Sequence, residues 1–190
     1  APLACAAAGI ALERANIKPQ AFTHLVTASC TGFAAPGFDI QMIERLGLPR
    51  TIARTHVGFM GCHGAFNALR VADALVTADP AAVVLVTALE LCSVHLSYGD
   101  DPQRIVANTL FADGAAALVC GGSGGGAPNS GATGNSFASA EDDAAALAGK
   151  LPVAPDNALR LIANGSCLMP DSAEAMTWRI GDHGFEMTLS

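Results

Sequence analysis

The sequence predicts an α/β fold in which helices cover both faces of a mixed, partly parallel β-sheet. Short apolar segments alternate along the chain with segments whose apolar residues recur at helical spacing. The short segments are hydrophobic almost throughout, which is typical of strands buried on both faces. Hydrophobic residues make up 51% of the 190 residues and charged residues only 14%. The chain can therefore form one sizeable core.

The first ninety or so residues alternate regularly between helix and strand patterns. Lys18-Pro19 ends the first helical pattern, Gly47 the second, and Asp79-Pro80 the third. The expected elements are a helix over 4–15, a strand over 24–29, a helix over 38–46, a strand over 51–57, a helix from Cys62 to residue 78 and a strand over 82–91.

Later segments are less regular. A short helix is expected over 105–111, followed by the Asp113-Gly114 turn and a buried strand over 115–120. Gly, Ser, Ala, Asn and Pro dominate the next twenty residues, so we expect a flexible surface excursion over about 121–149, with a short helix at 142–149. The remaining strands are expected at 159–168, 175–182 and 185–190, as a meander with turns at Gly165 and His183-Gly184.

Composition excludes several classes of partner. The net charge is −7 and the ten Lys and Arg residues do not cluster, which argues against nucleic acid and anionic membranes. No apolar run approaches the ~18 residues that would span a bilayer. The six cysteines show no CxxC pair or metal-ligand spacing, so we expect no metal site, no disulfide scaffold and a cytoplasmic location. Residues 2–10 lack the positively charged N-terminal segment of a signal peptide, so we expect a helix there instead.

Residues 58–66, Gly-Phe-Met-Gly-Cys-His-Gly-Ala-Phe, contain the strongest chemical signal. Cys62 is expected in the first turn of a helix, where unpaired backbone N–H groups favour thiolate over thiol. Gly61 and Gly64 would let backbone or substrate approach where a Cβ would collide. The pattern predicts an acyl-accepting cysteine. The alternative is a buried, inert cysteine.

Three more motifs accompany this one in a consistent order: Ser-Cys-Thr-Gly-Phe-Ala-Ala-Pro-Gly at 29–37, Val-Ala-Asn-Thr-Leu-Phe-Ala-Asp-Gly-Ala-Ala-Ala at 106–117, and Met-Pro-Asp-Ser at 169–172. Together the four resemble the type III polyketide synthases, the chalcone and stilbene synthase-like branch of the thiolase superfamily. The resemblance covers nearly the whole chain and weakens between about 121 and 159. The His63-Gly64-Ala65 continuation and residues 90–93 are more similar to bacterial members than to plant ones.

The resemblance implies a thiolase-like layered fold, mainly its N-terminal half, so that 1–190 form a partial condensing-enzyme domain. It implies that Cys62 accepts an acyl group from acyl-CoA and that decarboxylative condensation with malonyl-CoA extends it. It further implies a homodimer, with coenzyme A thioesters as substrates and no permanently bound cofactor. Residues that grip coenzyme A cannot be assigned. Fatty-acyl starters, and alkylresorcinol or alkylpyrone products, are the expected chemistry.

The resemblance also assigns substrate-binding residues. Phe111 matches the gatekeeper phenylalanine between the coenzyme A tunnel and the cavity, while Cys30, Cys92 and His95 match residues of the cavity wall. Each could instead be an ordinary core residue. Cys30 replaces a hydroxyl residue, which makes that wall more apolar. Ala35 stands where the family has a methionine that reaches into the neighbouring subunit, and the bond to Pro36 could be cis at modest cost.

Two other functions remain open. A ketoacyl-ACP synthase-like condensing enzyme shares the fold and the cysteine. A folded, non-catalytic fragment is the other alternative, because the family's catalytic His and Asn are expected beyond the position of Ser190. His63 is not expected to replace that His, since adjacent helical residues point in different directions. We therefore expect an internal fragment that is inactive in polyketide synthesis on its own.

Overall fold

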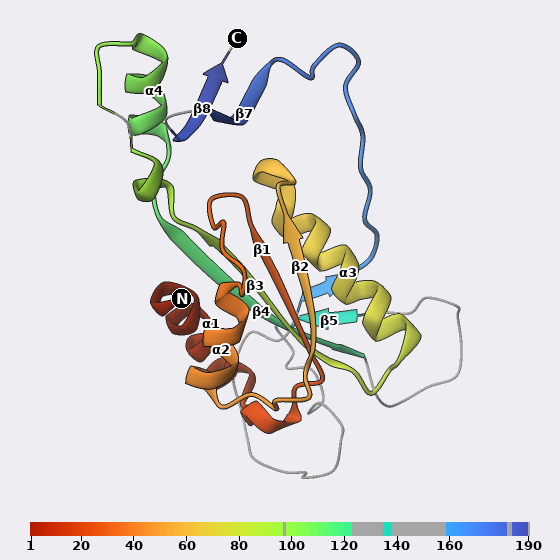
Figure 1. Ribbon diagram of the computed structural model, residues 1–190. Helices are drawn as coiled ribbons and strands as arrows, with labels where there is room; N and C mark the ends of the chain where they lie inside the picture. The colour runs from red at the N-terminus through yellow and green to blue at the C-terminus, as the bar shows by residue number, and fades with distance from the viewer. Residues whose placement is uncertain (97, 123–134, 138–158, 182–183, 190) are drawn as a thin grey trace.

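The computed structural model describes residues 1–96, 98–122, 135–137, 159–181 and 184–189 (Figure 1). Its helices are α1 (Pro2–Ala15), η1 (Pro19–Ala21), α2 (Phe38–Leu46), η2 (Gly61–His63), α3 (Gly64–Ala78), η3 (Cys92–His95) and α4 (Pro102–Leu110). Its strands are β1 (His24–Ser29), β2 (Ala53–Gly58), β3 (Val83–Glu90), β4 (Gly114–Gly122), β5 (Asn135–Phe137), β6 (Leu159–Leu161), β7 (Met176–Gly181) and β8 (Gly184–Leu189).

Six strands form one mixed sheet in the order β2-β1-β3-β4-β5-β6. β1 runs parallel to both β2 and β3, whereas β4, β5 and β6 add antiparallel pairs. The predicted fold class is therefore confirmed. Because parallel strands end at the same edge, the segments that follow β1, β2 and β3 meet there. These segments carry Cys30, Cys62 and Cys92.

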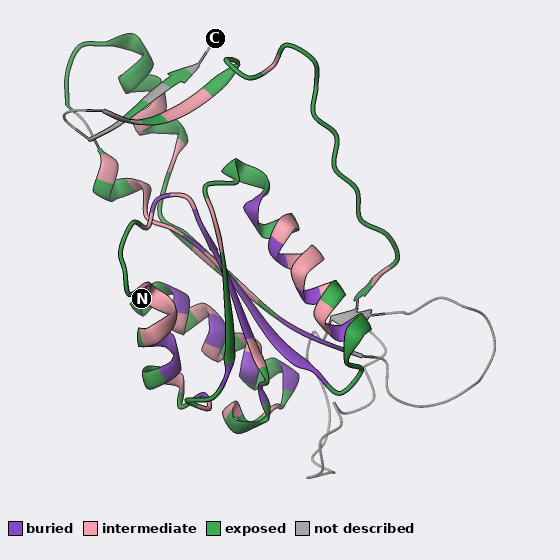
Figure 2. Cartoon of the chain, turned by 45° about the vertical axis from the view of Figure 1, so that its right-hand side comes forward, coloured by how far each residue is buried: buried purple, intermediate pink, exposed green. Residues whose placement is uncertain are grey.

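Helices pack on both faces of this sheet (Figures 1 and 2). α1 turns Ala4, Ala8 and Leu12 inward, one helical turn apart, and lies against β3 and β4. On the opposite face, α3 buries Ala68, Ala72 and Val76 at the same spacing. Successive residues of a strand point to opposite faces, so β3 contributes to both cores at once. The near-continuous apolar pattern of 82–91 has this physical cause.

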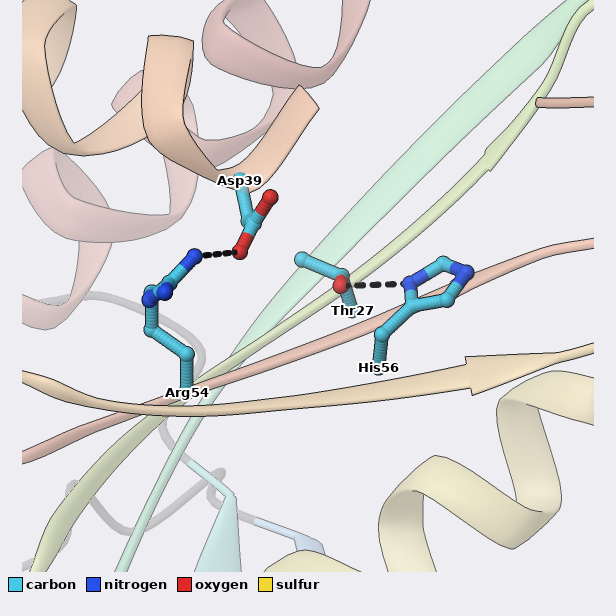
Figure 3. Close-up of polar contacts among 4 residues, drawn as sticks. All are labelled: Thr27, Asp39, Arg54 and His56. Carbon is cyan, nitrogen blue, oxygen red and sulfur yellow. Dashed lines mark hydrogen bonds and ion pairs between the residues drawn. The ribbon is translucent and has the colours of Figure 1, made fainter. Parts of the chain in front are cut away.

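Polar contacts fasten α2 and β1 to the edge strand β2 (Figure 3). Arg54 of β2 pairs with Asp39 in the first turn of α2 at 2.6 Å. The Nδ1 atom of His56 in β2 lies 2.8 Å from the Thr27 hydroxyl oxygen, and the His56 and Phe38 rings form a T-shaped contact. The ion pair is partly exposed and contributes roughly 0.2–1 kcal/mol. These contacts fix α2, and with it the end of the loop that contains the cis Ala35–Pro36 bond.

Several predicted boundaries shift. α4 begins at Pro102 instead of residue 105, because the Asp101 carboxylate caps it by accepting the Gln103 N–H at 3.0 Å. β5 falls within the predicted excursion at 121–149, most of which, including the expected helix at 142–149, lies outside the described residues.

The predicted three-stranded meander is wrong. β6 pairs with β5 in the large sheet, and only β7 and β8 form a separate hairpin. The segment between β6 and β7 contacts α3 instead, where Arg70 donates to the Asn164 side chain and to the Gly165 carbonyl. These side-chain bonds take the place of the strand pairing predicted for 162–168. Within the described residues, no helix has the length and apolarity required to cross a membrane.

Candidate active site

Cys62 lies in a tight turn at the carboxyl edge of the parallel strands. The turn is the short 3₁₀ helix η2, and α3 begins two residues after the cysteine. The prediction that Cys62 opens the long helix is therefore wrong by two residues. Phe59 and Gly61 both adopt left-handed φ angles, of 55° and 68°, so the chain reverses sharply after β2 and leaves the Cys62 side chain exposed.

Within the chain, neither glycine beside Cys62 is required by a close approach of backbone. A Cβ on Gly61 would meet nothing within 4 Å, so its positive φ is what requires glycine. A Cβ on Gly64 would make only ordinary contacts with Met60 and Ala28. His63 points to α3, with its Nδ1 2.9 Å from the Asn67 amide nitrogen, in keeping with the expectation that it turns away.

Glu90, the last residue of β3, joins the ends of β1 and β3. Its carboxylate accepts the Cys30 N–H at 2.9 Å and the Thr31 N–H at 3.0 Å, and it also accepts the Thr31 hydroxyl. That hydroxyl accepts the Leu91 N–H at 2.7 Å in turn. Hydrogen bonds to a carboxylate are stronger than neutral ones, so this junction is firmly held.

The same junction reaches the nucleophile turn. The Cys30 thiol lies 3.6 Å from the Gly61 carbonyl oxygen, to which it donates. Gly61 is the residue before Cys62, so the end of β1 packs directly against the turn. Of the four residues predicted to bind substrate, Cys30 reaches this turn through a hydrogen bond.

Cys92, Ser93 and His95 lie in η3, just beyond Glu90. The Asp113 carboxylate anchors this segment by accepting the Ser93 N–H at 2.8 Å and the Ser93 hydroxyl at 2.7 Å. These two bonds hold the pKa of Asp113 below its usual value. Asp113, predicted only as a turn residue, also positions the segment that bears Cys92.

His95 and Phe111 are brought together by Trp178. The Trp178 ring meets His95 edge-on at 5.8 Å between centroids and Phe111 at 6.1 Å. His95 Nε2 also lies 2.8 Å from the Thr31 carbonyl oxygen, which links this aromatic group to the Glu90 junction. Sequence reasoning missed Trp178, Glu90 and Thr31. The lone tryptophan of the chain was the one available signal.

The thiols around the turn differ in their electrostatics. Burial raises the pKa of Cys30, and the nearby Glu90 charge raises it further. Burial likewise raises the pKa of Cys92, with additional contributions from Glu90, Asp113 and Cys62. Cys120, in β4 and remote in sequence, is buried so fully that its pKa rises to about 12. Of these thiols, Cys30 and Cys92 lie near exposed Cys62 and resist ionisation.

Comparison with known proteins identifies the class. The model of the chalcone and stilbene synthases, N-terminal domain, matches residues 2–124. The chain belongs to this family. One curated relative is the alpha-pyrone synthesis polyketide synthase-like Pks18 of Mycobacterium tuberculosis, 44% identical over 122 residues that cover 64% of this chain and 31% of Pks18. Another is acylalkylpyrone synthase csyB of Aspergillus oryzae, 38% identical over 127 residues, covering 62% of this chain and 32% of csyB.

Solved structures agree with the fold. PKS-I from the brown alga Ectocarpus siliculosus is 32% identical and superposes with a TM-score of 0.79, covering 100% of this chain and 43% of that one. The C-terminal type III polyketide synthase domain of Steely1 from Dictyostelium gives 0.75 at 26% identity, with coverages of 100% and 45%. The fold is the thiolase-like one of type III polyketide synthases. The chain spans about a third of the length of the curated relatives above.

Proposed function

We propose that this chain is the nucleophile-bearing part of a type III polyketide synthase. The Cys62 sulfur attacks the carbonyl of an acyl-CoA, the new carbon–sulfur bond forms, and coenzyme A leaves as its thiolate. Malonyl-CoA then loses carbon dioxide, and the resulting enolate carbon attacks the acyl group and releases Cys62. The observation that carries the proposal is the exposed Cys62 on a sharp turn, at the edge where β1, β2 and β3 end.

The surrounding residues support this chemistry. Phe111 and His95, held by Trp178, and Cys30 and Cys92 beside the turn are proposed to form the wall that receives the acyl chain. The family resemblance supports acyl-CoA and malonyl-CoA as substrates, fatty-acyl starters, a homodimeric whole enzyme, a cytoplasmic location and no permanently bound cofactor or metal.

Acyl loading is the direct test. The chain is incubated with a fatty acyl-CoA, and intact and peptide mass spectrometry locate any thioester. Wild type should gain one acyl group on Cys62, and Cys62→Ala should gain none. Cys167→Ala, which removes another exposed thiol, is the matched control and should load normally. Acylation that persists in Cys62→Ala would contradict the proposal.

Extension is tested separately. With malonyl-CoA added, we expect the chain alone to form no pyrone or resorcinol, because it spans only about a third of the length of the curated relatives. Loading without extension distinguishes a nucleophile-bearing part from a folded, non-catalytic fragment, in which neither step occurs. Extension by this chain would show that its own residues supply the missing groups.

A further inference from the structure

Three thiols from three different elements gather where the parallel strands end. Cys30 follows β1, Cys62 lies in η2 and Cys92 opens η3. The Cys30 thiol donates to the carbonyl of Gly61, and Cys92 lies within electrostatic range of Cys62. An acyl thioester can form on any thiol that ionises, since the thiolate is the nucleophile. A site with three thiols must therefore favour one of them.

Glu90 lies where it can impose that choice. Its carboxylate is hydrogen-bonded to the backbone N–H groups of Cys30 and Thr31, so its negative charge is fixed beside the first thiol. In the sequence, only Leu91 lies between Glu90 and the second thiol, that of Cys92. A fixed negative charge disfavours a nearby thiolate, whereas an uncharged thiol is unaffected.

We propose that Glu90 is a positioning residue that reserves acyl transfer for Cys62. Its hydrogen bonds hold Cys30 against the Gly61–His63 turn, and its charge disfavours a second thiolate beside the nucleophile. The part of this proposal that concerns acyl groups rests on the proposed function. The part that concerns thiol ionisation rests on the geometry alone.

The other charged groups near Cys30, Cys62 and Cys92 either disfavour a thiolate, as Glu90 does, or face away from the thiols. Asp113 reinforces Glu90 at Cys92, and its bonds to Ser93 keep it ionised. The groups whose charge acts on Cys30 or Cys92 are Glu90 of β3, Asp113 ahead of β4 and Cys62 of η2. Two histidines, His63 of η2 and His95 of η3, lie on the same elements. His63 is turned to Asn67, and His95 to the Thr31 carbonyl.

The test measures alkylation rates of individual cysteines in the chain. Wild type, Glu90→Gln and Glu90→Asp are treated briefly with iodoacetamide between pH 7 and 10, and peptide mass spectrometry follows Cys30, Cys62 and Cys92. Glu44→Gln, which removes a charge from an exposed position on α2, is the matched control. Buried Cys120 is labelled only when the core opens, so it reports unfolding in every sample.

In Glu90→Gln, the labelling of Cys30 and Cys92 relative to Cys62 should rise roughly three- to tenfold at pH 8, because one like charge has gone. Glu90→Asp keeps the charge and should stay near wild type, as should Glu44→Gln. Unchanged ratios in Glu90→Gln with Cys120 protected would overturn the proposal. Equal acceleration of Cys120 would also overturn it, because Glu90 would then only maintain the fold.

Acyl loading of the same variants separates this proposal from the proposed function. In Glu90→Gln, we expect acyl groups on Cys30 or Cys92 as well as on Cys62. If wild type takes no acyl group at Cys62 while the alkylation ratios shift as described, the proposed function is wrong and the ordering of thiols by Glu90 stands. If acyl groups remain confined to Cys62 in Glu90→Gln, reservation by Glu90 is overturned.

Discussion

Two regions of this molecule contain similar residues and bury them very differently. Both hydrophobic cores consist of residues up to position 120, and side chains such as Leu25, Leu85 and Val84 are fully buried. No residue from 159 to 179 is buried, and Ile162 and Leu168 are 90% and 87% exposed (Figure 2). Apolar composition therefore does not itself produce a core.

The difference lies in what each region packs against. The first region has helices on both faces of its central strands, so most side chains of β1 and β3 are buried. The described part of the second region consists of short β6, a connecting segment and a two-stranded hairpin, which is marginal on its own. It is joined to the rest by the pairing of β6 with β5, by the contacts of Trp178 with His95 and Phe111, and by the bond of Arg70 to Asn164.

The largest expected effect on stability appears when the same substitution, leucine to alanine, is made in each region. Leu85→Ala in β3 removes a fully buried side chain and should lower the free energy of unfolding by about 2–5 kcal/mol. Leu168→Ala makes the same chemical change at an exposed position and should cost less than about 0.5 kcal/mol. Denaturant unfolding followed by far-ultraviolet circular dichroism measures both. Similar losses for the two variants would show that apolar side chains of the two regions contribute equally to the free energy of unfolding.

The contrast also explains what could be predicted from sequence. The bounds of β1 and α2 were predicted to the residue, because each has a clear period and the helix ends at Gly47 with φ 67°. In the first region, the sheet neighbours on both sides enforce the pattern that the sequence shows. The meander failed because β6 pairs with β5, and because Asn164 and Gly165 bond to a side chain of α3, which no strand pattern encodes.

The candidate site was predictable only in part. Cys62 and its neighbours came from a local motif and the resemblance. Glu90 and Trp178 escaped because their importance depends on partners far along the chain: Glu90 bonds to residues about sixty positions earlier, and Trp178 meets residues 95 and 111. Long-range contacts of this kind leave no periodic trace in one sequence.

The order of unfolding sharpens the comparison. Trp178 is the single tryptophan, so its fluorescence reports the hairpin region, while exposure of the Cys120 thiol reports the central sheet. We expect the fluorescence transition at a lower denaturant concentration than the loss of Cys120 protection, because no residue of β7 from Met176 to Arg179 is buried. Coincident transitions would mean that the two regions unfold as one cooperative unit.

A smaller effect measures the connection itself. A double-mutant cycle with Trp178→Leu and Phe111→Leu should yield a coupling of about 0.5–1.5 kcal/mol, the usual value for an edge-on aromatic pair. Pairing Trp178→Leu with Phe66→Leu, which changes an exposed ring on α3, is the control and should give additive losses. A coupling near zero in the first cycle would remove Trp178 as the link between hairpin and site.

The smallest effect concerns the exposed Asp113–Ser93 contact beside α4, and it depends on pH. The pKa of Asp113 is lowered in the folded chain, so the carboxylate stabilises the fold at pH values above its usual value of 3.8. That contribution disappears as the pH falls below 3.8 and through the lowered pKa. Asp113→Asn should therefore lower the midpoint of thermal unfolding slightly at pH 7, and the difference from wild type should narrow near pH 3. Ser93→Ala removes the hydroxyl partner and should show a pH dependence of the same sign. A difference that stays constant from pH 7 to pH 3 would mean that the carboxylate charge contributes nothing, and that the contact only fixes the shape of η3.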